Sequence, residues 1–269
     1  MSIKSLIKDF IPPILTRYIQ NGRKGIFGEY QTWDKAVNAS GEYSPDIKTL
    51  IDNHKLYRAN KSCVYNRLDS TNKVWAWCTL SGLQLAAREC GNCLKVLDFG
   101  GSLGSTYFQL TDFLSSINSL KWCVVDQKEC VEAGKLHFAD DRLEFFLSPE
   151  VAAEKYNFDV LVLGGVLQYL PSPHKTLSNL LRNDFKFVFL DRTPIYPGSD
   201  EKIKLQQTPL ELGGDLHPIR LLSEEKLMNI FADSYSLLAQ HNYGPFPYNT
   251  SISNYKCFLF RRGQKDFSS

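Results

Sequence analysis

The chain has 269 residues, of which 43% are hydrophobic and 22% are charged, and this composition is typical of a globular protein with one large core. Its 31 basic and 29 acidic residues are spread along the sequence and give a net charge of +2, which excludes the basic surface that binds nucleic acid. A small-molecule or glycan substrate fits this balance better. No apolar run approaches the roughly 20 residues of a membrane-spanning helix, and the N-terminus lacks the apolar region of a signal peptide, so we expect a cytoplasmic protein.

The cysteines and histidines indicate neither disulfides nor a metal site. There are seven cysteines, an odd number at irregular spacing, and several lie in apolar runs, as buried free thiols of a reducing compartment do. Cys90 and Cys93 form the one close pair, but they precede an apolar run instead of opening a helix, so we interpret them as part of a loop. The histidines and acids show no metal-ligand spacing.

The first 93 residues lack an alternation of strands and helices and predict a helical N-terminal cap. Residues 2–20 have apolar side chains at helical spacing, interrupted by Pro12 and Pro13. This segment either packs on its own domain, which is the commoner arrangement, or makes a peripheral contact with a membrane. Two further helices are expected over 45–58 and 72–90. Aromatic residues of the cap either stack on a sugar ring or form its core; they are Tyr30, Trp33, Tyr43, Tyr57 and Tyr65.

From residue 94 to the end, short apolar runs alternate with helical stretches, which predicts a parallel sheet with helices on both faces. The expected strands are 94–98, 121–126, 143–147, 158–163, 186–191, 235–240 and 255–261. A loop without a crossover helix separates the last two, so they should pair antiparallel at the sheet edge. The fold class is therefore α/β, with a seven-stranded Rossmann-like core over 94–269.

The first of these strands ends in the glycine-rich turn VLDFGGSLG. Gly100 allows a tight turn, Gly101 and Ser102 let backbone N–H groups approach a ligand, and Gly104 allows the next helix to pack closely on the strand. An acid, Asp98, leads into this turn and would repel a pyrophosphate but attract an ammonium group. The turn therefore favours S-adenosyl-L-methionine over NAD.

Two later positions extend the predicted cofactor site. Asp126 ends the second strand 22 residues after Gly104, where an acid accepts hydrogen bonds from both ribose hydroxyls. Gly164 and Gly165 follow the fourth strand at the carboxyl edge of the sheet, where the methionine portion of the cofactor could lie against backbone. Gln168 and its neighbour Tyr169 are the polar side chains expected to face the same cleft.

These motifs together resemble the class I S-adenosylmethionine-dependent methyltransferases over about residues 94–261. Including the segments PPIL, GEYQTWDKA and GEY of the N-terminal part, the whole chain is similar to a bacterial group of methyltransferase-like proteins that accompany surface-polysaccharide and O-antigen genes. Ser102 stands where many members of the superfamily have a third glycine; serine is small enough to preserve the turn, and its hydroxyl could contact the cofactor carboxylate.

Methyl transfer to a hydroxyl needs a general base, and three residues are candidates. His217 is the first choice because it stands in an expected long loop beside Gly213, Gly214 and Pro218. Asp191 ends the fifth strand and serves either as a base or as the partner of Arg192. His174 follows the fourth strand at an expected helix start.

The sequence thus predicts a methyltransferase that O-methylates a sugar of a nucleotide-sugar or surface-glycan intermediate and releases S-adenosyl-L-homocysteine. Two alternatives remain open at this point. One is an NAD(P)-dependent oxidoreductase, which the acid before the glycine turn disfavours. The other is a non-catalytic binding protein that retains the same fold and the same glycine turn.

Overall fold

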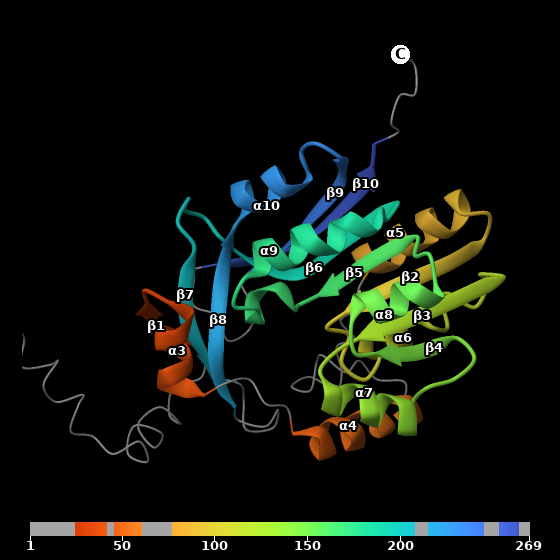
Figure 1. Ribbon diagram of the computed structural model, residues 1–269, viewed down its shortest axis with the longest axis horizontal. Coiled ribbons are helices and arrows are strands. Elements are labelled where there is room, and N and C mark those ends of the chain that lie inside the picture. Colours follow the sequence, from red (N-terminus) through yellow and green to blue (C-terminus); the bar gives the residue numbers. More distant parts are fainter. Residues whose placement is uncertain (1–24, 42–45, 61–76, 208–214, 245–252, 264–269) are drawn as a thin grey trace, which may run out of the picture.

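The computed structural model describes residues 25–41, 46–60, 77–207, 215–244 and 253–263. In these segments a ten-stranded sheet with helices on both faces forms the centre of the molecule (Figure 1). Seven of the strands form a Rossmann-like core sheet in the order β4-β3-β2-β5-β6-β10-β9. Their bounds are β2 Cys93–Phe99, β3 Ser119–Val125, β4 Leu143–Phe146, β5 Val160–Gly164, β6 Phe187–Tyr196, β9 Tyr235–Gly244 and β10 Asn254–Arg262.

The core sheet confirms the α/β fold class and all seven strands expected from the sequence. β10 runs antiparallel to both of its neighbours, β6 and β9, while the pairs among β2 to β6 are parallel. The predicted antiparallel pair of the last two strands is therefore confirmed. The main difference is the length of β6, which continues from Asp191 to Tyr196.

Two hydrophobic clusters cover the two faces of the core sheet because side chains alternate along each strand. On β6, Phe187 and Phe189 belong to one cluster, and Val188 and Leu190 belong to the other. Helices α4 (Ile47–Asn60), α5 (Trp77–Glu89), α6 (Ser105–Leu110) and α7 (Lys128–His137) contribute to the first. The second contains residues of α8 (Pro149–Lys155), α9 (Pro173–Leu180) and α10 (Glu224–Phe231). Burial on both faces explains the nearly continuous apolar runs of these strands.

Local sequence signals fix the starts of two of these helices. The Ser148 hydroxyl accepts a hydrogen bond from the N–H of Val151 at 3.3 Å, and Pro149 occupies the first turn of α8. In the same way, Ser223 accepts from the N–H of Lys226 at 3.4 Å and begins α10 directly after a strand. Both helices are thereby aligned with the ends of the strands that precede them.

Three further strands form an antiparallel side sheet that the sequence analysis did not predict. They are β1 Gly25–Tyr30, β7 Lys202–Gln207 and β8 Leu216–Ser223, and the short helix α3 (Trp33–Ser40) packs beside them. The sequence analysis expected a cap of helices and aromatic-rich loops in this part of the chain, and the strand β1 corrects that expectation at residues 25–30. The expectation of a long loop around residue 217 is also wrong, since most of it forms the β7 and β8 pair.

The side sheet continues the core sheet at its carboxyl edge. On one side of β6, the pairing with β5 ends at Gly164 and Asp191, and the pairing with β8 begins four residues later at Ile195 and Leu222. β10 occupies the other side of β6. β8 therefore takes the place of β5 beyond the end of that strand, close to where ligands bind in open α/β sheets.

Several expectations for the N-terminal part lie outside the described residues, among them the helix over 2–20 and the side chains of Tyr43 and Tyr65. The expected helices over 45–58 and 72–90 correspond to α4 and α5 in the described segments. Tyr30 and Trp33 pack against the buried side chains of β7. No helix within the described residues is long and apolar enough to cross a membrane.

Six cysteines lie in the part of the chain that the structure describes, and all six are free thiols there. Cys90 and Cys93 flank the turn between α5 and β2. Among the same residues, no group of three or more histidines, cysteines and acids is arranged as a metal site.

Candidate active site at the carboxyl edge of the sheet

The glycine turn after β2 requires glycine at two positions, each of which has a positive φ and a close neighbouring side chain. Gly100 has a φ of +73°, and a Cβ atom there would lie only 2.3 Å from Cγ2 of Val166. Gly104 has a φ of +85° at the start of α6, where a Cβ atom would meet the Leu143 side chain at 3.0 Å. Residues with a Cβ atom rarely adopt these backbone angles. The turn can therefore adopt this conformation without strain only with glycine at positions 100 and 104.

Asp126 is joined to this turn from the end of β3. One carboxylate oxygen, Oδ2, accepts the N–H of Ser102 at 2.8 Å, and Oδ1 accepts the N–H of Gln127 at 2.7 Å. Burial raises the pKa of Asp126, and both backbone hydrogen bonds oppose that rise. Each carboxylate oxygen can accept a second hydrogen bond, so the acid remains suited to a diol. Ser102 itself has a φ of +54°, which the bond to Asp126 helps to hold.

Asp98 is buried beneath the same turn, with only 1% of its surface exposed. Its Oδ2 accepts the indole N–H of Trp122 at 3.0 Å, and a Cβ atom on Gly101 would lie 2.6 Å from the Asp98 carboxyl carbon. Within the described segments, Oδ1 has no hydrogen-bond partner. Burial raises the pKa of Asp98 to about 7, although the Trp122 hydrogen bond and the Arg192 charge each lower it. The chain thus holds a desolvated carboxyl group with an unused acceptor.

Arg192 is a site residue that the sequence analysis named only as a possible partner of Asp191. Its guanidinium group lies across the end of β5: a Cβ atom on Gly164 would be 2.8 Å from the terminal nitrogen Nη2, and one on Gly165 would be 3.6 Å from Nε. Glycine at 164 and 165 therefore makes room for this side chain. The two glycines lie at the edge as predicted, and they accommodate an arginine of the next strand.

A β-bulge in β6 aims Arg192 in this direction. Thr193 pairs with Lys256 and Leu190 pairs with Phe258, so Asp191 and Arg192 together oppose the single residue Cys257. Arg192 has a φ of +49°, a strained angle for a residue with a side chain. Bulges beside sites re-aim side chains in this way.

Asp191 holds the bulge with both of its carboxylate oxygens. Oδ1 accepts the hydroxyl of Tyr243 at 2.7 Å, and Oδ2 lies 3.1 Å from Nη1 of Arg192. Only 1% of Asp191 is exposed. Of its two predicted roles, the structure therefore supports that of partner to Arg192.

Gln168 lies beside these residues on the short helix η1 (Leu167–Tyr169), which follows the two glycines. Its amide nitrogen is 3.5 Å from the backbone oxygen of Arg192, and its Oε1 has no hydrogen-bond partner among the residues described. The side chain is buried, with 3% of its surface exposed. Gln168 is therefore buried beside the glycines at the end of β5, and its expected position facing the ligand cleft stays a prediction.

His217 lies on β8 and is buried with 1% exposure, in place of the expected loop. Its ring packs edge-on against that of Tyr169 at 5.1 Å between centroids, and the Tyr169 hydroxyl donates to Gln206 on β7 at 2.9 Å. Burial lowers the pKa of His217 to about 4, so the imidazole is neutral at pH 7. The side sheet thereby brings a neutral histidine to the helix that follows β5.

His174 takes part in a different cluster. Its Nε2 lies 2.6 Å from Oε1 of Glu201, an acid that also accepts the N–H of Ser223 at 3.2 Å and pairs with Arg220 at 3.5 Å. These contacts join the start of α9 to the strands of the side sheet. They give His174 a structural role and do not connect it to the glycine turn.

His54 was missed by the sequence analysis and reaches the turn from α4. Its Nε2 lies 2.8 Å from the hydroxyl oxygen of Ser105, the residue directly after Gly104, and its Nδ1 lies 2.9 Å from the backbone oxygen of Leu50. The ring is buried with 1% exposure. An isolated histidine on a helix gives no signal of such a contact in the sequence.

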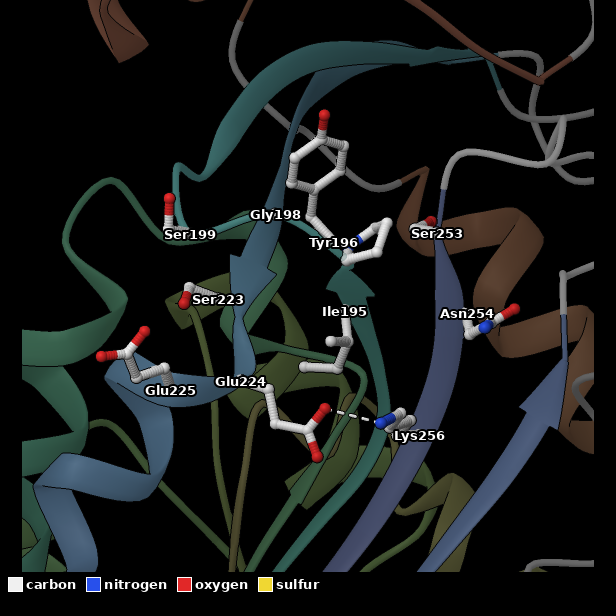
Figure 2. Close-up of a pocket in the computed structure, with 11 residues that line it drawn as sticks. Ile195, Tyr196, Gly198, Ser199, Ser223, Glu224, Glu225, Ser253, Asn254 and Lys256 are labelled. Carbon is white, nitrogen blue, oxygen red and sulfur yellow. Dashed lines mark hydrogen bonds and ion pairs between the residues drawn. The ribbon is translucent and has the colours of Figure 1, made fainter.

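A polar pocket of about 380 Å³ lies further along β6, at the carboxyl ends of β6 and β8 and beside the start of α10 (Figure 2). Glu224 and Lys256 point toward each other there and form an ion pair at 2.6 Å. The hydroxyl, carboxylate and amide groups of the pocket come from Tyr196, Ser199, Ser223, Glu224, Glu225, Ser253 and Asn254. Ile195, at its base, is four residues beyond Asp191, or roughly 13 Å along an extended strand.

The residues at the edge fit the chemistry of S-adenosyl-L-methionine. Asp126 offers carboxylate oxygens to a diol, and the buried Oδ1 of Asp98 is an acceptor for an ammonium group. A pyrophosphate fits less well, because the N–H of Ser102 in the turn already donates to a carboxylate.

Comparisons with known proteins give distant structural likenesses. No protein-family model and no curated protein matches the chain. The N-terminal domain of EvdMO1 with SAH bound is 13% identical, with a TM-score of 0.46 over 68% of this chain and 81% of that one. The magnesium protoporphyrin IX methyltransferase ChlM from Synechocystis PCC 6803 with bound SAM is 12% identical, with a TM-score of 0.45 over 98% of both chains.

The glycopeptide N-methyltransferase MtfA complexed with S-adenosyl-L-methionine is 16% identical, with a TM-score of 0.45 over 69% of this chain and 94% of that one. At these identities and TM-scores the likenesses carry no argument about activity. The residues at the carboxyl edge are therefore the basis on which a function is inferred.

Proposed function

We propose that the protein is an S-adenosyl-L-methionine-dependent methyltransferase. The observation that carries this proposal is the convergence of two acids on one glycine turn: Asp98 lies under Gly101, and Asp126 accepts the N–H of Ser102. An ammonium group and a ribose diol are the complements of these two carboxyl groups, and S-adenosyl-L-methionine presents both. The topology supports the same position, since β2 and β5 are adjacent parallel strands between which the strand order reverses, and ligands bind at such switch points in open α/β sheets.

We infer that NAD(P) chemistry is the weaker candidate. A dinucleotide needs free backbone N–H groups for its pyrophosphate at the start of the helix. In this turn a carboxylate already accepts the N–H of Ser102, and Asp98 adds a second acid. These contacts favour a ligand with a cationic end.

The acceptor we propose is a sugar hydroxyl of a nucleotide-sugar or surface-glycan intermediate. The polar pocket of Figure 2, whose hydroxyl, carboxylate and amide groups suit a polyhydroxylated ligand, would hold a part of the acceptor remote from the reacting hydroxyl. Its residue Ser223 is six residues, or roughly 20 Å, from His217 along β8. The cofactor, when bound, supplies an electrophilic methyl group. The chain then orients the acceptor oxygen and removes its proton.

For the general base we propose His217, whose imidazole is neutral at pH 7 as a base must be, although the burial that lowers its pKa to about 4 also makes it a weaker base than an exposed histidine. Its contact with Tyr169 places it beside the helix that follows Gly165. Asp191 is assigned to positioning Arg192, and His174 to the contact with Glu201.

The test combines binding with turnover. Isothermal titration calorimetry with S-adenosylhomocysteine should give a saturable isotherm, and neither NAD nor NADP should displace the ligand. The protein is then incubated with S-adenosylmethionine and a panel of sugar nucleotides and glycans, and a methylated product should be heavier than its acceptor by about 14 daltons, the mass of one CH2 group. Binding without any transfer across the panel would support the non-catalytic alternative, whereas binding of NAD with no binding of S-adenosylhomocysteine would refute the proposal.

A further inference from the structure

The guanidinium group of Arg192 occupies an unusual position for a residue of β6. It turns back over the end of β5, where a Cβ atom on Gly164 would lie 2.8 Å from Nη2 of Arg192 and 3.6 Å from the hydroxyl oxygen of Thr106 on α6. The side chain is 14% exposed. Arg192 thus points toward the helix that begins at the glycine turn, and not along its own strand.

A carboxyl group of opposite charge lies on the other side of β5. Asp98 pairs in register with Val162, two residues before Gly164, and its buried Oδ1 has no hydrogen-bond partner within the described part of the chain. The Arg192 charge is close enough to lower the pKa of Asp98. One cation and one anion therefore flank the backbone at the end of β5, on the side of the glycine turn.

We propose that Arg192 binds the carboxylate of the amino-acid end of the cofactor while Asp98 binds its ammonium group. This inference rests on the proposed function and assigns a second charged residue to the same site. An α-amino acid carries its two charges on neighbouring atoms, and a guanidinium group is the side chain best shaped to hold a carboxylate through two parallel hydrogen bonds.

The way in which Arg192 is held agrees with a binding role. Asp191, fixed by Tyr243, contacts the guanidinium group through Nη1. The bulge and the positive φ of Arg192 aim the side chain over two glycines, and a normally paired β6 would direct it elsewhere. A purely structural ion pair between neighbouring residues needs neither the bulge nor the glycines.

Three ligands separate this inference from the proposed function. S-adenosylhomocysteine carries both charges, its decarboxylated analogue keeps only the amine, and methylthioadenosine lacks both. For the wild-type protein we expect the decarboxylated analogue to bind about 10- to 100-fold more weakly than S-adenosylhomocysteine, the range for one charged hydrogen-bonding group. This comparison requires no variant. Equal affinities would overturn the assignment of Arg192, and absence of binding by all three ligands would overturn the proposed function with it.

Variants of Arg192 then test whether this residue causes the preference for a ligand with a carboxylate. Arg192→Gln should lower the affinity for S-adenosylhomocysteine by the same factor and leave the affinity for methylthioadenosine unchanged. Unchanged binding of methylthioadenosine also shows that the variant is folded. Arg192→Lys should recover part of the loss because it keeps the charge. Arg182→Gln, an exposed position on η2 (Leu181–Asn183) at the opposite edge of the sheet, is the matched control and should bind all three ligands as the wild type does. If Arg192→Gln lowers the affinity for methylthioadenosine as much as the affinity for S-adenosylhomocysteine, Arg192 only supports the fold.

Discussion

The core sheet and the side sheet differ in the kind of polar residue that they bury. The core sheet buries two acids at its carboxyl edge, Asp98 and Asp191, and each is held by a hydrogen bond from an aromatic side chain. The side sheet buries a histidine and a lysine, and Lys204 donates to the backbone oxygen of Gly28 at 2.9 Å. Under the proposed function, the core sheet would bind the cationic end of the cofactor and the side sheet would contribute to the acceptor site beside it.

The largest effect should come from the glycine turn of the core sheet. Gly100→Val places side-chain atoms where Val166 lies and forces a residue with a side chain to a φ of +73°, so we expect no measurable binding of S-adenosylhomocysteine by calorimetry. Gly91→Val is the matched control, because Gly91 has a similar φ of +69° but no atom within 4 Å of an added Cβ. Equal binding by both variants would show that the turn has only a structural role.

The side sheet should affect turnover without affecting cofactor binding. If His217 is the base, His217→Ala should lower turnover by about 10²- to 10⁴-fold with the identified acceptor, while the affinity for S-adenosylhomocysteine stays near the wild-type value. His174→Ala serves as the control on the same network of strands and should retain turnover. Normal turnover of His217→Ala would show that His217 is not the general base.

Asp126 connects the turn to β3, and replacing it should have an effect of intermediate size on the affinity for the cofactor. Asp126→Ala removes the acceptors for the ribose and also the partner of the Ser102 N–H, so the affinity should fall by at least about 1.5–3 kcal/mol. Asp126→Asn keeps one carbonyl acceptor and should lose less. Unchanged affinity of Asp126→Ala in calorimetry would mean that this acid does not contact the ligand.

The smallest effect is a pH dependence that arises from Asp98. Because its pKa is about 7 in the free protein, the carboxyl group is increasingly protonated below pH 7 and must lose its proton to pair with an ammonium group. Between pH 8 and pH 6, the affinity for S-adenosylhomocysteine should therefore decrease as the pH is lowered, by at most about tenfold per unit below pH 7. Asp98→Asn should bind weakly with little pH dependence, whereas a wild-type affinity that is constant over this range would argue against Asp98 as the ammonium partner.

The core sheet could be predicted from the sequence because both of its faces are covered. Residues such as Val160 to Leu163 are all fully buried and form a short apolar run, and the glycine turn and Asp126 follow strands of this kind. The side sheet lacks that signal. In β8, Pro218 disfavours a strand and His217 interrupts the apolar pattern, and in β7 the buried Lys204 does the same.

Part of the candidate site could also be predicted from the sequence. Residues that follow a strand directly, such as Asp126 and Gly164, could be assigned to the carboxyl edge from their position alone. The roles of Arg192 and His54 depend on contacts between segments that are distant in the sequence: Arg192 is aimed by a bulge opposite Cys257, and His54 meets Ser105 from another helix. Neither a bulge nor a helix contact of this kind has a local pattern.

The central claim is that the carboxyl edge of the core sheet binds S-adenosyl-L-methionine, and direct titration of the wild-type protein tests it. Calorimetry at pH 8 with S-adenosylhomocysteine, followed by NAD as a competitor, should show one saturable site that NAD does not occupy. Loss of that isotherm in Gly100→Val, with its retention in Gly91→Val, would place the site at the turn. A wild-type protein that binds NAD and not S-adenosylhomocysteine would contradict the account.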